Sequence, residues 1–171
     1  GVQKIIGELR ERFSWVICDS PAGIERGAIL AMRHADAAVI VTNPEVSSVR
    51  DSDRIIGMLD SKTEKAEKGE RIEKHLLITR YDAARASRGE MLSIDDVLEI
   101  LSTPLLGIIP ESEDVLRASN IGLPVTLSDR SSAPAQAYIE AARRLQGEDV
   151  SMTIPHVRKG LLLKLFGRRA A

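Results

Sequence analysis

The sequence is poor in cysteine, in aromatic residues and in long apolar runs. Its 171 residues include one cysteine, and only 3% of them are aromatic. A single cysteine cannot close an intramolecular disulfide, and no apolar run approaches the ~20 residues that a membrane-spanning helix needs. Lys and Arg number 24 against 25 Asp and Glu, which gives no electrostatic reason to expect a nucleic-acid partner. We therefore expect a cytoplasmic domain that is neither disulfide-stapled nor transmembrane.

Two kinds of site are also missing from the sequence. No glycine-rich loop of the form G-x-x-x-x-G-K-[ST] occurs, and this is the loop whose backbone N–H groups cradle nucleotide phosphates. His34, His75 and His156 lie far apart and there is no cysteine pair, so no direct metal ligand is predicted. The chain as it stands is not expected to build a phosphate cradle.

Four short apolar runs alternate with segments of helical spacing. The runs are rich in Ile, Val and Leu without strict polar alternation, which is typical of strands buried on both faces. Because strand and helix alternate without a hairpin signal, we predict an α/β fold with a doubly wound, mostly parallel sheet. The charged stretch 62–74 is predicted to be a solvated loop. The predicted strands are 15–18, 37–42, 75–79 and 105–109, and the predicted helices include 2–12, 47–59, 94–101 and 133–145.

The residues after each strand are the first candidates for chemistry, since ligands of such sheets sit beyond the carboxyl ends of the strands. The sharpest pattern places Asp19 directly after a predicted strand, with Pro21 and Gly23 just beyond. A carboxylate there lies within reach of a metal-bound water, and the turn lets the backbone approach a γ-phosphate. In the alternative interpretation, Asp19 only ends the strand and caps the next helix. Cys18, inside the run, is predicted to be a buried packing residue.

The segment 43–54 crowds charges onto the first turns of a predicted helix. Arg50, Asp51, Asp53 and Arg54 all fall there. One interpretation is a solvated helix face whose aspartates lie favourably near the helix N-terminus. The other is a charged docking surface for a partner. Spacing alone favours the solvated face.

The C-terminal segment is basic and amphipathic. Residues 157–171 hold five Lys or Arg and no acid, and on a helical wheel their large apolar side chains sweep one broad arc. Such a segment is drawn to anionic headgroups and lies in the membrane plane as a reversible anchor. The alternative is a last helix that docks its apolar arc on the domain. We favour the membrane anchor, because residues 148–156, which include Pro155, have the character of a linker that follows a domain of residues 1–147. The predicted membrane residues are Leu161, Leu162, Leu163, Lys164, Leu165 and Phe166.

Four runs, together with this tail, resemble one family. They are Cys-Asp-Ser-Pro-Ala-Gly-Ile-Glu at 18–25, Thr-Asn-Pro-Glu-Val-Ser-Ser-Val-Arg-Asp-Ser-Asp-Arg at 42–54, Ser-Arg-Gly-Glu-Met-Leu-Ser-Ile-Asp-Asp-Val-Leu at 87–98 and Val-Leu-Arg-Ala-Ser-Asn at 115–120. They are similar to the MinD family, the bacterial septum-site-determining ATPases of the deviant Walker A class. Relatives that segregate plasmids or carry iron–sulfur chemistry share the Asp-x-Pro-x-Gly turn, but we do not expect them to share the other runs.

The resemblance implies a nucleotide cycle that uses ATP and Mg²⁺. Asp19 matches the switch II carboxylate that helps orient Mg²⁺ and the attacking water. The matching switch loop is Pro21, Ala22, Gly23, Ile24 and Glu25, of which the last two would lie near the homodimer interface that ATP creates. The residues at the strand ends where the family holds the adenine base are Thr79, Arg80, Pro110 and Glu111.

The resemblance also implies partners. Asp51 and Asp53 match the helix face on which MinC and MinE compete, which reverses the preference for a solvated face. Residues 161–166 would be the membrane-targeting sequence. The intact protein is thereby expected to hydrolyse ATP, to dimerise and to bind anionic phospholipid on the cytoplasmic face of the inner membrane. There it would recruit the division inhibitor MinC under MinE control, with no nucleic-acid partner.

The chain departs from the family at its front. The family's nucleotide loop and switch I precede the first matching residue, and the sequence begins at Gly1. We therefore expect the C-terminal part of a MinD, P-loop NTPase-like with its N-terminal strands missing, short by roughly a hundred residues. Two alternatives stay open: a non-catalytic module that retains the partner face and the membrane segment, and a plasmid or flagellar positioning ATPase.

Overall fold

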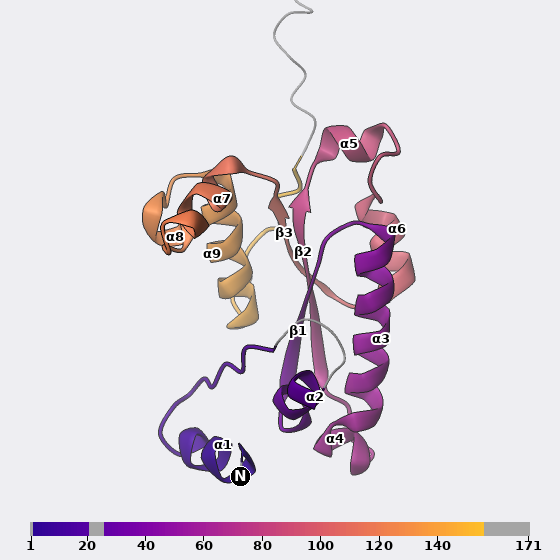
Figure 1. Cartoon of the computed structure of the whole chain (residues 1–171), viewed down its shortest axis with the longest axis vertical. Coiled ribbons are helices and arrows are strands. Elements are labelled where there is room, and N and C mark those ends of the chain that lie inside the picture. Colours follow the sequence, from indigo (N-terminus) through magenta and orange to yellow (C-terminus); the bar gives the residue numbers. More distant parts are fainter. Residues whose placement is uncertain (1, 21–25, 156–171) are drawn as a thin grey trace, which may run out of the picture.

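The computed structural model describes residues 2–20 and 26–155 (Figure 1). Over these residues, helices and strands succeed each other as the α/β prediction requires. The elements in chain order are α1 (Val2–Arg10), α2 (Arg26–Arg33), β1 (Ala37–Thr42), α3 (Val46–Lys62), α4 (Glu64–Glu67), β2 (Glu73–Tyr81), α5 (Ala83–Ser87), α6 (Ile94–Leu101), β3 (Leu105–Pro110), α7 (Glu113–Asn120), α8 (Val125–Ser128) and α9 (Ala133–Leu145).

The three strands form a parallel sheet in the order β1-β2-β3. β1 and β2 pair without a break from Ala37 opposite Glu73 to Thr42 opposite Ile78. The predicted strand 37–42 is confirmed to the residue, whereas β2 and β3 extend beyond the predicted 75–79 and 105–109. The predicted α/β class with a parallel sheet is confirmed.

Successive residues of β2 point to opposite faces of the sheet, and each face is covered by different helices. On one face, Leu76 and Ile78 are completely buried in a core that includes Val49 of α3 and Val97 of α6. On the other face, Leu77 packs with residues of β3 and α9. Figure 1 shows α3 and α6 on one flank of the sheet and α9 on the opposite flank.

A glycine lets α9 approach the sheet closely. A Cβ added at Gly107 of β3 would lie 3.1 Å from the Cβ of Ala141 and 3.3 Å from Cδ1 of Leu77. The absence of a side chain at this position is therefore a packing requirement of the second layer. The small Ala141 on the facing side of α9 meets the same requirement.

The ends of two helices lie where the sequence predicts them. At the start of α6, Ser93 Oγ accepts the N–H of Asp96 at 3.1 Å, and the Asp96 carboxylate accepts the N–H of Ser93 at 2.9 Å. This capping box satisfies two N–H groups that the helix leaves unpaired. α9 spans the predicted 133–145 and is followed by Gly147 with φ 86°, the left-handed conformation that ends many helices.

Two expectations are wrong. Residues 15–18 form no strand: Trp15 and Ile17 are 55% and 88% exposed, and Cys18, predicted to be buried, is exposed. A strand requires a neighbour for its ladder of hydrogen bonds, and among the described residues none pairs with this run. The stretch 62–74 is not wholly a loop, because it contains α4, whose first turn is capped by Thr63 Oγ1 accepting the N–H of Ala66 at 3.1 Å.

Candidate functional site

The carboxyl ends of the strands meet at one edge of the sheet, as parallel pairing demands. Beyond β1, the Asn43 side chain accepts a hydrogen bond from Thr79 Oγ1 at 2.9 Å, which joins the ends of β1 and β2. Between β2 and β3, Glu111 N–H donates to the carbonyl of Tyr81 at 3.0 Å. The three strand ends are therefore tied into one platform.

Arg80 has an unusual backbone on this platform. Its φ is 56°, a left-handed conformation that costs a non-glycine residue energy and that often marks a functional position. It lies where the register between β2 and β3 shifts, between Ile78 and Tyr81. The Arg80 guanidinium lies 3.3 Å from one carboxylate oxygen of Glu111, and Arg85 lies 3.7 Å from the other. The structure thus gathers the predicted residues Thr79, Arg80, Pro110 and Glu111 at one edge.

The predicted switch carboxylate, Asp19, is not part of this platform. Asp19 is exposed, in the irregular segment after α1 instead of at the end of a strand. Residues 15–18 form no strand that would place Asp19 at the carboxyl edge, and no hydrogen bond or ion pair described for residues 2–20 and 26–155 joins Asp19 to the strand-end residues. Pro21, Ala22, Gly23, Ile24 and Glu25 lie outside the described residues.

The predicted partner face lies on α3. Val49, Ser52 and Leu59 bury one side of this helix, whereas Asp51 and Asp53 are exposed. Asp51 makes a 3.4 Å ion pair with Arg54 of the same helix. The predicted membrane residues, Leu161 to Phe166, lie outside the described residues. No described helix is both long and apolar enough to cross a bilayer.

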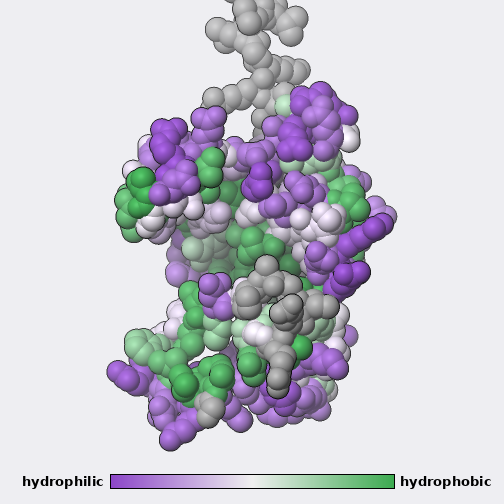
Figure 2. All heavy atoms as spheres, viewed as in Figure 1, coloured by the Kyte–Doolittle hydropathy of each residue, from purple (hydrophilic) through white to green (hydrophobic). Residues whose placement is uncertain are grey.

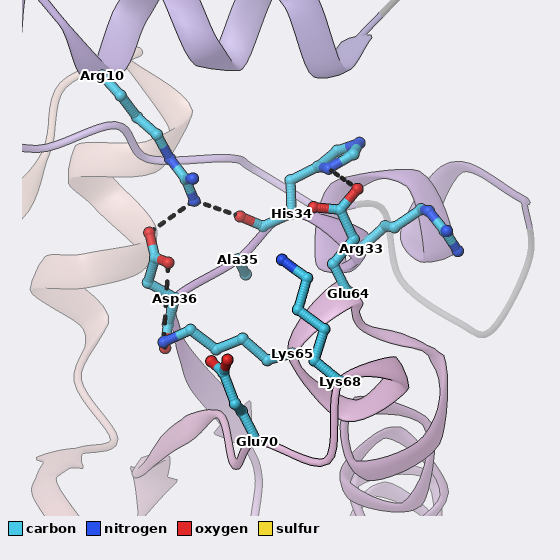
Figure 3. A pocket seen from close by; sticks show the side chains of 9 residues that line it. All are labelled: Arg10, Arg33, His34, Ala35, Asp36, Glu64, Lys65, Lys68 and Glu70. Carbon is cyan, nitrogen blue, oxygen red and sulfur yellow. Dashed lines mark hydrogen bonds and ion pairs between the residues drawn. The ribbon is translucent and has the colours of Figure 1, made fainter.

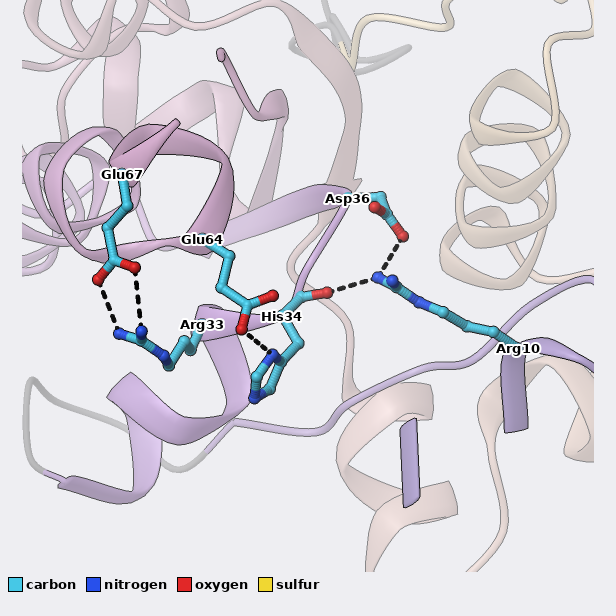
Figure 4. Close-up of polar contacts among 6 residues, drawn as sticks. All are labelled: Arg10, Arg33, His34, Asp36, Glu64 and Glu67. Atoms are coloured by element: carbon cyan, nitrogen blue, oxygen red, sulfur yellow. Dashed lines mark hydrogen bonds and ion pairs between the residues drawn. The ribbon is translucent and has the colours of Figure 1, made fainter. Parts of the chain in front are cut away.

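The sequence reasoning missed a charged cluster around the C-terminal end of α2. Arg33 makes two hydrogen bonds with the Glu67 carboxylate, at 2.9 and 3.0 Å, and His34 Nδ1 lies 3.0 Å from Glu64 Oε1 (Figure 4). From α1, Arg10 donates to the His34 carbonyl and to the Asp36 carboxylate, both at 2.6 Å. Because the pairs join residues about thirty positions apart, helical spacing could not reveal them.

This cluster surrounds a small cavity of about 110 Å³. Figure 3 shows side chains from α1, the end of α2 and α4 around it, including Lys65 and Lys68 of the α4 region. The His34 side chain is only 9% exposed. Cations and carboxylates alternate around the cavity, so the cluster ties α1, α2 and α4 together.

The ring of His34 also affects the titration of its partner. Its hydrogen bond to Glu64 holds the pKa of that carboxyl below the ordinary value, against a smaller opposing effect of desolvation. A lowered pKa means that the ionised carboxylate favours the folded chain.

The chain was compared with known proteins. No protein-family model matches it. The septum site-determining protein MinD of Neisseria meningitidis serogroup B is 52% identical over 171 residues, and that of Escherichia coli K12 is 54% identical over 170 residues. Both matches cover 98% of this chain, and the chain spans 63% of the length of each relative.

Solved structures agree. The MinD cell division protein of Aquifex aeolicus superposes with a TM-score of 0.80 at 38% identity, and a MinC:MinD complex from the same organism with 0.78 at 36%; each covers 90% of this chain and 62% of the other. MinD of Pyrococcus horikoshii, complexed with Mg-ADP, has a TM-score of 0.70 at 26% identity, covering 84% of this chain and 55% of that one. The described residues therefore have the fold of the P-loop MinD and ParA ATPases. Within that class, the chain is similar to MinD septum site-determining proteins over the residues that it spans.

The His34–Glu64 pair yields a pH prediction. Since the folded pKa of Glu64 is lowered, its contribution to stability is present above its unfolded pKa of about 4.3 and is lost as the pH falls through the folded value. We expect Glu64→Gln to lower the urea midpoint at pH 6, and the difference from the parent chain to shrink steadily as the pH falls below about 4.3. The matched control is Glu70→Gln, which lines the same cavity. An equal loss for both variants at pH 6, or a loss that does not shrink as the pH falls below about 4.3, would contradict the prediction.

Proposed function

We propose that this chain supplies the switch carboxylate, the adenine platform, the partner face and the membrane segment of a MinD-type ATPase that places the division site. One observation carries the proposal: identity above half with two MinD proteins over 98% of the chain. The chain spans 63% of those relatives, so the cycle below concerns the intact protein. A plasmid or flagellar positioning ATPase is less well supported, because these curated relatives are septum site-determining proteins.

In the proposed reaction, the chain orients ATP and water without covalent chemistry of its own. Thr79, Arg80, Pro110 and Glu111 border the adenine base on the rigid platform at the carboxyl edge of the sheet. Asp19 orients Mg²⁺ and the attacking water, and Pro21 to Glu25 form the loop that responds to the nucleotide. The Mg-ADP complex of the Pyrococcus horikoshii protein supports the choice of nucleotide. Mg²⁺ would neutralise charge that develops on the phosphates.

Partner binding uses charge on α3. Asp51 and Asp53 are exposed, as are Arg50 and Arg54, and the helix is held by its buried side, so these residues form a fixed surface of mixed charge. MinC and MinE compete for this surface in the proposed cycle. The solved MinC:MinD complex supports MinC as a partner of this fold.

Membrane binding depends on the tail and on dimerisation. One short amphipathic anchor binds weakly and reversibly, whereas two anchors held in one dimer bind with avidity. ATP-dependent dimerisation therefore brings the protein to the cytoplasmic face of the inner membrane. MinE-stimulated hydrolysis releases it.

The first test concerns nucleotide. None of the 171 residues forms the glycine-rich lysine loop, so titration of Mg-ATP into this chain should give no calorimetric heat of binding. The intact protein under the same conditions should bind. Saturable binding by the 171-residue chain would show that the platform alone holds ATP and would overturn this part of the proposal.

The second test concerns the membrane. Replacement of Leu162 or Phe166 by Glu places a charge in the apolar arc, and we expect pelleting of the intact protein with anionic vesicles and ATP to fall more than about tenfold. The control is Ile154→Glu, a change at an exposed apolar residue just before the segment. If the tail variants pellet as the parent protein does, the assignment of this segment as a membrane anchor is wrong.

The third test concerns MinC. Asp53→Asn should weaken capture of MinC by the intact protein roughly tenfold, which corresponds to about 1.4 kcal/mol. Asp95→Asn, at an exposed aspartate in the first turn of α6, is the control. If both variants retain MinC equally, Asp53 is not in the partner face.

A further inference from the structure

An apolar groove lies between α7, α8 and α9, on the flank of the molecule farthest from α3. Its volume is about 630 Å³ and its lining includes Val115, Leu123, Pro124, Val125, Tyr138 and Ala142. We call it the α7–α9 groove. Burial beside it raises the pKa of the Tyr138 hydroxyl, as expected where water is scarce.

Large apolar side chains also stand exposed on the helices that border the groove. Leu116, Ile121 and Leu127 are 63%, 66% and 72% exposed. Figure 2 shows hydrophobic residues at the outer edge of this flank, where Figure 1 places α8. Exposed apolar side chains gathered around a hollow mark an interaction site.

The course of the chain after α9 determines where a candidate occupant begins. After α9, the Arg144 guanidinium donates to the carbonyls of Val150 and Ser151 at 3.2 and 3.0 Å, which holds this stretch beside the helix. Met152 packs against the core shared by α3 and α6, and the described chain continues to Pro155. Five residues then precede Leu161, and an extended chain of that length reaches about 17 Å. The apolar run 161–166 therefore begins within a short tether of Pro155.

Two carboxylates near the borders of the groove can pair with cations of the tail. The tail, residues 157–171, carries five cations and no acid. Glu113 and Asp114 begin α7 and Asp129 follows α8; Asp114 is paired with Arg117 at 3.4 Å, whereas the ion pairs of residues 2–20 and 26–155 include neither Glu113 nor Asp129. A basic amphipathic segment can place its leucines in the groove and its cations against Glu113 and Asp129.

We propose that the α7–α9 groove holds the apolar arc of residues 161–166 whenever the chain is away from a lipid surface. The same leucines then cover either the groove or the membrane, but not both. The groove thereby competes with the membrane and lowers the apparent lipid affinity of a single chain. Only the membrane half of this exchange rests on the proposed function.

Amide hydrogen exchange on the full chain, compared with a chain truncated after His156, tests the docking directly. We expect the amides of 113–128 to exchange at least threefold faster after truncation, and those of β2 to be unchanged. Equal exchange in the two chains overturns the proposal. Protection that disappears on tenfold dilution of the full chain also overturns it, because a second copy would then be the occupant.

Vesicle partitioning tests the competition. Leu123→Glu, at a groove residue 47% exposed, should raise binding of the full chain to phosphatidylglycerol vesicles about three- to tenfold. Ile100→Glu on α6, 49% exposed, is the matched control and should leave binding unchanged. Ser119→Glu, at a second groove residue, replaces Leu123→Glu if that variant does not fold. No gain with either groove variant overturns the competition.

The two readouts also separate this proposal from the proposed function. If truncation releases the protection of 113–128 but neither parent nor groove variants bind vesicles, the tail docks in the groove and the membrane assignment fails. If vesicles bind and truncation leaves exchange unchanged, the anchor stands and the groove proposal fails.

Discussion

The pairing of β2 with a parallel neighbour on each side is the constraint on which the rest of the structure depends. A central parallel strand must be apolar on both faces, and both faces must be covered. Leu76 and Ile78 meet this requirement toward α3 and α6, and Leu77 meets it toward α9. Pairing in the same direction also places every strand end at one edge, so the candidate adenine platform follows from the same hydrogen bonds as the core.

The same constraint explains the one strand that does not form. Residues 15–18 have the composition of a doubly buried strand, yet composition supplies only half of what a strand requires. The other half is a neighbouring backbone, and among the described residues β1 pairs with β2 alone. Trp15 and Ile17 are left exposed as a result. The position of Asp19 depends on that strand, which is why the predicted switch carboxylate is the part of the candidate site that the described structure leaves open.

Charge has different roles at the two ends of the sheet. At the carboxyl edge, Glu111 is shared by Arg80 and Arg85, which steadies a backbone held in a left-handed conformation. At the other end, Arg33 and His34 bind the carboxylates of α4 and hold the helix that follows the predicted switch loop. Both clusters are largely exposed, so geometry and specificity are their main contributions and net stability is a minor one.

Sequence patterns were sufficient to predict the elements whose bounds are set by interactions between residues close together in the chain. The strand 37–42, the capped helix 94–101 and the helix 133–145 could be predicted to the residue, because apolar period, a Ser93 cap and a terminal glycine act within a few positions. The strand-end residues could be named, since parallel sheets bring strand ends together. Three other features depend on residues distant in sequence. They are the pairing of residues 15–18, the contact of Arg33 and His34 with α4, and the groove between α7 and α9. Those contacts form only when the chain is folded, and no spacing rule along the chain encodes them.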